Sequence, residues 1–223
     1  MPRGPPAVLT WLVRSWSVVI PAKRLPVAKT RLRPLTAHRS DADAAHRELV
    51  LALLADTVAA AVACPVVGAV VVVTDDPAAA AVVRDLGART VADEPDGGLN
   101  PALEHGARQA PGTAVAALSS DLAALRPDEL TAALRAAAGS TRAFVADAEG
   151  TGTTLLTAVD AELLPRFGPG SAEAHLAGGA APLSGTWPGL VRDVDTEADL
   201  RAVLALGAGP RTTAVAGRLG SAV

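Results

Sequence analysis

Residues 115–125 read VAALSSDLAAL: an apolar run gives way, through two serines and Asp121, to a segment of helical composition. Residues 191–200, VRDVDTEADL, repeat this arrangement near the other end of the chain, with Asp193 at the start of the polar part. The carboxyl ends of parallel strands lie at one edge of a sheet, and ligands bind there. Two carboxylates at that edge could share a divalent metal ion.

The segments around these aspartates alternate between strand-like and helix-like sequence. We expect strands at residues 16–22, 68–76, 88–93, 114–121 and 142–148, and helices at residues 41–63, 77–87, 101–110 and 126–139. Pro77 and Pro101 suit the first turn of a helix, and Gly87 suits the end of one. This alternation predicts an α/β fold, with a mostly parallel central sheet and helices on both faces.

The pattern continues over residues 16–208, which we expect to form a single domain. We treat residues 1–15 as an N-terminal extension. Residues 209–223 have no firm periodicity and are interpreted as a C-terminal tail.

Composition excludes several classes of partner. The net charge is −3 and the pI about 5.8, which argues against a nucleic-acid-binding surface. The apolar run at residues 58–73 is divided by Pro65 and Gly68, so we expect soluble core and no membrane partner. A single cysteine, Cys64, cannot form an internal disulfide, which favours a reducing, cytoplasmic location.

A basic loop follows the first expected strand. Residues 23–35 read KRLPVAKTRLRPL, and their cations are Lys23, Arg24, Lys29, Arg31 and Arg33. Such a loop could bind a triphosphate and stabilise the charge on a leaving pyrophosphate; the alternative is a solvated basic turn. The chain lacks both the P-loop and the G-x-G-x-x-G fingerprint, which disfavours an ATPase or a dehydrogenase. We therefore predict nucleotide binding by Lys23, Arg24 and Lys29.

Six motifs in order resemble one enzyme family. They are IPAKRLPVAKTRL, GLNPAL, SSDLAAL, GTGTTLL, FGPGSAEAH and DVDTEADL, spread over residues 16–204. The chain resembles the guanylyltransferases of deazaflavin cofactor biosynthesis, which belong to the molybdopterin-guanylyltransferase-like superfamily. The resemblance implies a Rossmann-like, GT-A-type nucleotidyltransferase fold.

The resemblance also implies substrates. In the bacterial branch, GTP is the donor and phosphoenolpyruvate the acceptor, giving enolpyruvyl-diphosphoguanosine and pyrophosphate; the archaeal branch uses 2-phospholactate. A downstream transferase of the same pathway is a potential partner. The acceptor phosphate is already ionised, so the transfer needs positioning and charge neutralisation but no general base.

Mg²⁺ is the cofactor that this chemistry implies, because it prefers oxygen ligands from one or two carboxylates. We assign Asp121 and Asp193 to it, with Asp195 as a third ligand, and we give Lys23, Asp121 and Asp193 catalytic roles. The alternatives are structural: Asp121 could cap the following helix, and Asp195 or Thr196 could cap the helix near the C-terminus.

The acceptor is expected in the second half of the chain. Carried over by motif, its binding residues are Thr153, Gly168 and Ser171. Gly150 and Gly152 in EGTGTT could let the backbone approach an anion, although a tight turn would look the same. Ser171 could be a helix N-cap or an oxyanion donor.

Three further residues remain open. His175 lies one helical turn after Ser171 and could reach the same anion, or could serve only in packing. For the base, Glu94 could accept from guanine donors, and Asn100 could contact ribose or base or simply cap the next helix. The preference for guanine comes from the resemblance alone.

The sequence departs from the family pattern at two positions. Ala123 stands where a proline usually follows D-L, and Thr154 replaces an asparagine; the second change concerns an acceptor contact, and neither removes a metal carboxylate. The rival functions are another sugar-phosphate or molybdopterin nucleotidyltransferase and a non-catalytic nucleotide-binding subunit. The presence of Asp121, Asp193 and Lys23 argues against the second rival.

Overall fold

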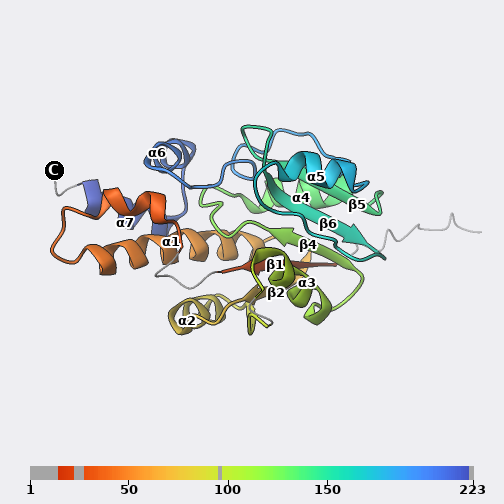
Figure 1. The fold of residues 1–223 in the computed structure, drawn as a ribbon, viewed down its shortest axis with the longest axis horizontal. Helices are drawn as coiled ribbons and strands as arrows, with labels where there is room; N and C mark the ends of the chain where they lie inside the picture. Colours follow the sequence, from red (N-terminus) through yellow and green to blue (C-terminus); the bar gives the residue numbers. More distant parts are fainter. Residues whose placement is uncertain (1–14, 23–27, 95–96, 221–223) are drawn as a thin grey trace, which may run out of the picture.

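The computed structural model describes residues 15–22, 28–94 and 97–220. Within them a seven-stranded sheet has the order β3-β2-β1-β4-β6-β5-β7 (Figure 1). Its strands are β1 (Trp16–Pro21), β2 (Val67–Val73), β3 (Arg89–Val91), β4 (Ala114–Leu118), β5 (Arg142–Ala146), β6 (Thr153–Val159) and β7 (Ala181–Pro182). Strands β3, β2, β1 and β4 are mutually parallel, as the sequence predicts.

Strand β6 is the main departure from the expected order of strands. It runs antiparallel between β4 and β5, with Leu118 paired to Leu155. Its first residues belong to EGTGTT, for which an anion-binding loop and a tight turn were the two alternatives; β6 follows a tight hairpin, and no helix separates it from β5. The antiparallel direction brings the start of β6 to the edge where β4 ends, which places Thr153 beside the segment that carries Asp121.

Helices cover both faces of the sheet, as expected. One face packs against α1 (Ala42–Val62), α2 (Pro77–Asp85) and α4 (Pro127–Ala137), and the other against α3 (Leu99–Gln109) and α5 (Ser171–Ala177). The buried side chains are mostly Ala, Val and Leu, consistent with the scarcity of aromatic residues. The single-domain α/β class with a mostly parallel sheet is therefore confirmed.

The C-terminal segment is a helix, and its interpretation as a tail is wrong for residues 210–220. Helix α7 (Pro210–Gly220) follows α6 (Glu197–Leu206) and packs along α1 (Figure 1). It buries Thr212, Val215 and Leu219 at helical spacing. Asp56 of α1 accepts hydrogen bonds from the N–H groups of Arg211 and Thr212 at the start of α7. The spacing of these residues was a local signal for a helix, but Asp56, which caps it, lies far away in the sequence.

The basic loop contains a short 3-10 helix, η2 (Thr30–Leu35). Lys29 precedes it in the left-handed region, with φ 50°. Among the described residues, no helix combines the length and the apolar character that crossing a membrane requires.

Candidate active site

A pocket of about 330 Å³ opens at the edge where β1 and β4 end. Its lining combines apolar side chains, among them Leu53, Leu103 and Phe167, with Lys29 and acidic side chains. Both characters follow from the fold, because the helices contribute aliphatic residues and the loops after the strands contribute polar ones. The pocket is therefore suited to a ligand with one apolar and one charged part.

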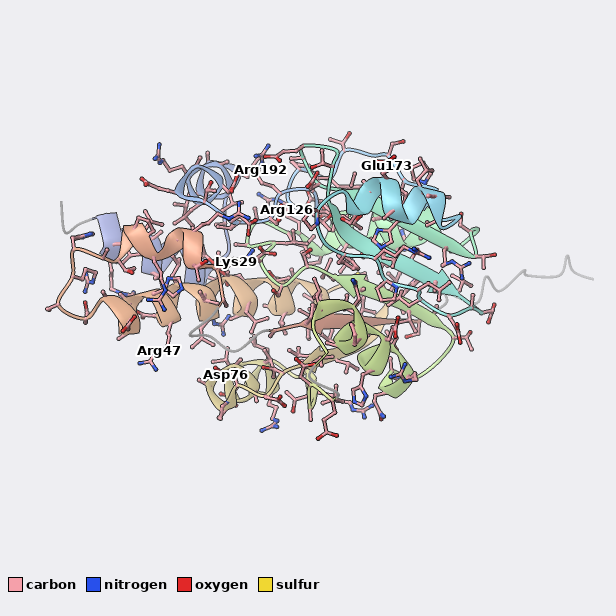
Figure 2. The ribbon with its side chains drawn as sticks, in the orientation of Figure 1. Lys29, Arg47, Asp76, Arg126, Glu173 and Arg192 are labelled. Carbon is pink, nitrogen blue, oxygen red and sulfur yellow. The ribbon has the colours of Figure 1, made fainter. Side chains whose placement is uncertain are left out.

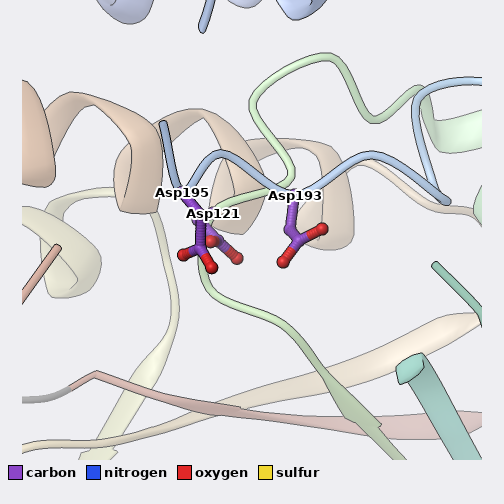
Figure 3. Close-up of side chains that lie close together, drawn as sticks. All are labelled: Asp121, Asp193 and Asp195. Carbon is purple, nitrogen blue, oxygen red and sulfur yellow. The ribbon is translucent and has the colours of Figure 1, made fainter. Parts of the chain in front are cut away.

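Three carboxylates meet in this pocket. Asp121 follows β4, whereas Asp193 and Asp195 belong to the segment before α6 (Figure 3). One oxygen from each lies within 4.8 Å of the others. Asp121 is buried, and α4 begins only at Pro127 with Arg126 as its N-cap, so capping does not explain Asp121. The structure thus brings together the residues that the sequence predicts as metal ligands.

The helix after Asp195 is capped by its neighbours. Thr196 is the N-cap of α6, and its hydroxyl accepts from the N–H of Asp199, while the Asp199 carboxylate accepts from the N–H of Thr196. Asp195 contributes only its backbone N–H to this arrangement, donating to Asp199. Its carboxylate is consequently directed to the pocket, where it contacts Lys29 at 2.6 Å and Arg31 at 3.3 Å.

Lys29 bridges two of the three carboxylates. Lys29 is labelled in Figure 2. Its ammonium group donates to Asp121 and to Asp195. Burial acts to lower the pKa of Lys29, but the charges of Asp121 and Asp195 outweigh it and hold that pKa above its usual value. Lys29 therefore remains protonated and supplies one positive charge to a cluster with three carboxylates.

The cluster retains an excess of negative charge. Burial, with the charge of Asp121 adding to it, raises the pKa of Asp193 to about 6. For Asp195, burial acts in the same direction, but the charge and hydrogen bond of Lys29 prevail and lower its pKa. The three carboxylates provide oxygen ligands, and two of them already bind the ammonium of Lys29. The cluster therefore fits a hard divalent metal ion.

The other cations of the basic loop have different surroundings. Lys23 and Arg24 lie outside the described residues, so their assignment to nucleotide binding and, for Lys23, catalysis stays a prediction. Arg31 lines the pocket next to Asp195. Arg33 instead pairs with Asp43 on α1 at 2.8 Å, away from the carboxylate cluster.

The EGTGTT segment forms a hairpin that Asp147 holds closed. The Asp147 carboxylate accepts from the N–H groups of Thr151 at 2.9 Å and Gly152 at 2.8 Å. A Cβ at Gly152 would lie only 2.3 Å from that carboxylate, so the residue must be glycine for packing reasons. These two N–H groups are thus used within the turn, which leaves side chains as the donors that this segment offers to an anion.

Thr153 contacts His175. The Thr153 hydroxyl lies 2.9 Å from His175 Nδ1, and His175 Nε2 accepts the N–H of Arg166 at 2.9 Å. Burial, together with the charge of Arg166, lowers the pKa of His175 to about 4. Neighbouring Thr154, where the family has asparagine, has a buried hydroxyl for which the described residues provide no hydrogen-bond partner.

The FGPGS segment leads into α5. Gly168 and Gly170 have φ of 139° and 70°, values that favour glycine. Gly170 is the N-cap of α5 and Ser171 is its first residue, so the alternative of Ser171 as N-cap is wrong by one position. Ser171 is nonetheless buried at 2% exposure, on the same helix as His175.

The two residues expected to contact the base or ribose of the nucleotide have different surroundings. Glu94 is exposed, after β3. Asn100 lies inside α3, whose N-cap is Gly98, so it does not cap that helix. Its side-chain amide donates to the carbonyl of Phe167 at 3.0 Å and accepts from the N–H of Phe167 at 2.8 Å. Contact with guanine or ribose stays a prediction for both residues.

Sequence reasoning missed several contacts in this region. They are the pairing of Arg31 with Asp195, the closure of the hairpin by Asp147, and the place of Phe167 in the pocket wall. Asp147 carried the one available signal, because aspartate side chains at turns accept nearby backbone N–H groups. The contacts of Arg31 and Phe167 depend on chain segments distant in the sequence.

Comparison with known proteins identifies close relatives. The chain is 68% identical over 205 residues to the phosphoenolpyruvate guanylyltransferase of Geodermatophilus obscurus, covering 92% of this chain and 95% of the relative. It is 53% identical over 210 residues to the protein of the same name from Streptomyces coelicolor, covering 92% and 97%.

Solved structures share the fold at lower identity. A nucleotidyl transferase from Methanothermobacter thermautotroptrophicus superposes with a TM-score of 0.64 at 22% identity, covering 86% of this chain and 97% of the other. The 4-diphosphocytidyl-2C-methyl-D-erythritol synthase of Anaerococcus prevotii gives a TM-score of 0.56 at 10% identity, covering 87% and 96%. The nucleotidyltransferase fold expected from the sequence is confirmed.

The profile of one family matches nearly all of the chain. The match extends over residues 16–223 and therefore includes α7 as well as the carboxylate cluster. Together with the close relatives, it confirms the resemblance drawn from the six motifs, and the chain belongs to the guanylyl transferase CofC-like family.

Proposed function

We propose that this protein transfers GMP from GTP to phosphoenolpyruvate, forming enolpyruvyl-diphosphoguanosine and pyrophosphate. The observation that carries the proposal is the meeting of Asp121, Asp193 and Asp195 with Lys29 in one pocket at the sheet edge. Membership of the family and relatives named phosphoenolpyruvate guanylyltransferase support the choice of substrates. The product is an activated diphosphate ester, suited to consumption by a downstream transferase of the same pathway.

We expect the two substrates to bind in neighbouring regions, the nucleotide in the pocket and the acceptor near β6. The apolar wall that includes Leu103 and Phe167 suits the base and ribose, and the loop with Lys29 and Arg31 suits the phosphates. Thr153 and Ser171 lie on the other side of β4 from that loop, where an acceptor could approach. The hydrogen bond from Ser119 N–H to the carbonyl of Thr154 fixes the distance between the two regions.

The reaction needs little from protein side chains beyond positioning and charge. A phosphate oxygen of phosphoenolpyruvate attacks the α-phosphorus of GTP, and the bond from that phosphorus to the leaving pyrophosphate breaks. The attacking oxygen is ionised at neutral pH, so no base removes a proton. Lys29 and Arg31 line the pocket and would stabilise negative charge on the triphosphate.

Asp121, Asp193 and Asp195 would hold Mg²⁺, which would compete with Lys29 for Asp121 and Asp195. A bound divalent ion supplies charge neutralisation at the transferring phosphoryl group. The set of three carboxylates within one pocket fits such an ion, and their oxygens are ligands that Mg²⁺ prefers.

The test is pyrophosphate release by purified protein with Mg²⁺. GTP is compared with the other three nucleotides, phosphoenolpyruvate with 2-phospholactate, and the product is identified by mass. We expect turnover that requires GTP and phosphoenolpyruvate together. Turnover with 2-phospholactate in place of phosphoenolpyruvate would overturn the acceptor assignment, and GTP binding without turnover for any acceptor would favour a non-catalytic nucleotide-binding subunit.

A further inference from the structure

His175 occupies a buried position where its protonation is determined by its neighbours. It is 2% exposed, lies between Phe144 and Phe167, and contacts the latter edge-on with ring centroids 5.2 Å apart. The backbone N–H of Arg166 can only donate, so His175 Nε2 must be an acceptor without a proton. A neutral imidazole with a bare Nε2 carries its single proton on Nδ1.

This tautomer determines the direction of the hydrogen bond to Thr153. Nδ1–H donates to the Thr153 hydroxyl oxygen across 2.9 Å. A hydroxyl has one proton, and with the oxygen accepting from His175 that proton is available for a different acceptor. Thr153 is therefore polarised as a donor at the start of β6, the end nearest the carboxylate cluster.

The same imidazole also holds a loop. Its Nε2 binds the backbone of Arg166, and Asn100 binds both the N–H and the carbonyl of the next residue, Phe167. Phe167 lines the pocket that contains the carboxylates. His175 is thus linked through one nitrogen to Thr153 and through the other to the loop between the pocket and Ser171.

We propose that His175 is a positioning residue for the acceptor: it orients the Thr153 hydroxyl to donate to an anionic oxygen of phosphoenolpyruvate. This inference rests on the proposed function, and it assigns to the imidazole a task different from direct contact with the anion. Both of its ring nitrogens are engaged with the protein, so it has no free atom to offer a ligand.

Two substitutions distinguish the roles of the two ring nitrogens of His175. In His175→Asn the side-chain amide N–H lies near the place of Nδ1 and can still donate to Thr153. In His175→Gln the side-chain carbonyl lies near the place of Nε2 and can still accept from Arg166, but Thr153 loses its partner. A purely structural role predicts similar losses in both variants. A positioning role predicts that only His175→Gln impairs binding of the acceptor.

The measurement is the KM for each substrate and kcat, with folding checked by thermal melts. We expect His175→Gln to raise the KM for phosphoenolpyruvate about tenfold, the loss of roughly one hydrogen bond to an anion, while the KM for GTP stays unchanged. Thr153→Val should match it, and the double variant should be no worse than Thr153→Val alone. His175→Asn should stay within about threefold of the wild type, because it retains that bond.

Three results would overturn the inference: an unchanged KM for phosphoenolpyruvate in His175→Gln, an equal rise for GTP, or additive effects in the double variant. The tautomer is measured independently by nitrogen NMR on the unliganded wild-type protein, and a proton found on Nε2 would also overturn it. Failure of the wild-type protein to use phosphoenolpyruvate would instead refute the proposed function, which keeps the two failures distinguishable.

Discussion

Acidic side chains enter the interior of this protein in two regions, and their surroundings are opposite. At the contact of α1 with α7, Asp56 is 5% exposed and accepts from two backbone N–H groups, at 2.7 Å from Thr212 and 3.3 Å from Arg211. At the sheet edge, Asp121, Asp193 and Asp195 crowd together around the ammonium of Lys29. The Asp56 carboxylate has two N–H donors for its charge. The cluster carries more negative charge than its cationic partners neutralise.

This difference separates an architectural role from a functional one. A buried carboxylate with backbone donors at a helix N-terminus is stabilising, because it satisfies N–H groups that the helix leaves unpaired. Like charges held close together raise the free energy of the folded state, and a protein keeps them where a ligand will compensate. The comparison predicts opposite consequences when each carboxylate is removed.

The largest effect is expected on activity in Asp121→Asn. Loss of a charge from the cluster should reduce turnover roughly a thousandfold, the scale seen when a main electrostatic stabiliser of a transition state is removed. The free energy of unfolding should change little, because relief of the repulsion among the carboxylates offsets the weaker contact with Lys29. Pyrophosphate release and urea denaturation measure the two quantities. Near-normal turnover in this variant would show that the cluster is not the metal site.

Asp56→Ala should have the reverse profile. Removing the carboxylate leaves two N–H groups at the start of α7 without their acceptor, which should cost about 3 kcal/mol in the free energy of unfolding. Activity per folded molecule should stay unchanged, since α7 lies away from the pocket.

Asp56→Asn is the matched control. Its amide oxygen can still accept one N–H, so we expect about half of the loss of Asp56→Ala. A loss of activity in folded Asp56→Ala protein would contradict the separation of the two regions.

The same contrast explains what sequence could predict. Strands β1, β2 and β4 were recognisable because both faces are buried and their apolar runs are continuous. Asp121 was recognisable because it follows the apolar run of β4 by two serines, whereas the matching arrangement expected before Asp193 is wrong, because residues 183–192 form turns and irregular backbone and no strand. Helix α7 was missed, because Asp56, which caps it, is more than 150 residues away in sequence.

The sequence did not indicate which side chains would contact one another or in which direction β6 would run. The left-handed conformation at Lys29, which places its ammonium between two carboxylates, has no local signature in a loop rich in cations. The EGTGTT motif was compatible with a tight turn, but it did not indicate that β6 inserts antiparallel between β4 and β5. The pairing of Thr153 with His175 depends on how α5 packs on β6, which is a tertiary effect.

A smaller effect is expected from pH, through Asp193. Its pKa is raised to about 6 in the folded protein, above the ordinary value of 3.8, so the folded state binds this proton more tightly than the unfolded state. Its contribution to stability therefore decreases as pH rises from 3.8 through 6, and stays low above 6. Because Asp193 is half-buried, we estimate this loss at about 1–2 kcal/mol after solvent screening.

Asp193→Asn tests the sign of this effect. The variant should be more stable than the wild type at pH 7 by about 1–2 kcal/mol, and the difference should shrink toward pH 4. Denaturation curves recorded between pH 4 and pH 8 measure it. A variant less stable than the wild type at pH 7 would mean that Asp193 is satisfied in the way that Asp56 is.

The smallest effect, and the most selective, is stabilisation by the metal itself. An ion that binds the folded state at ten times its dissociation constant raises the free energy of unfolding by about 1.4 kcal/mol. We expect Mg²⁺ to raise the melting temperature of the wild type and of Asp56→Asn, and to leave Asp121→Asn unchanged, with EDTA reversing the shift. The ion must displace Lys29 from Asp121 and Asp195, so Lys29→Met should bind it more tightly than the wild type does. Weaker binding in Lys29→Met would show that the ammonium supports the ion rather than competing with it.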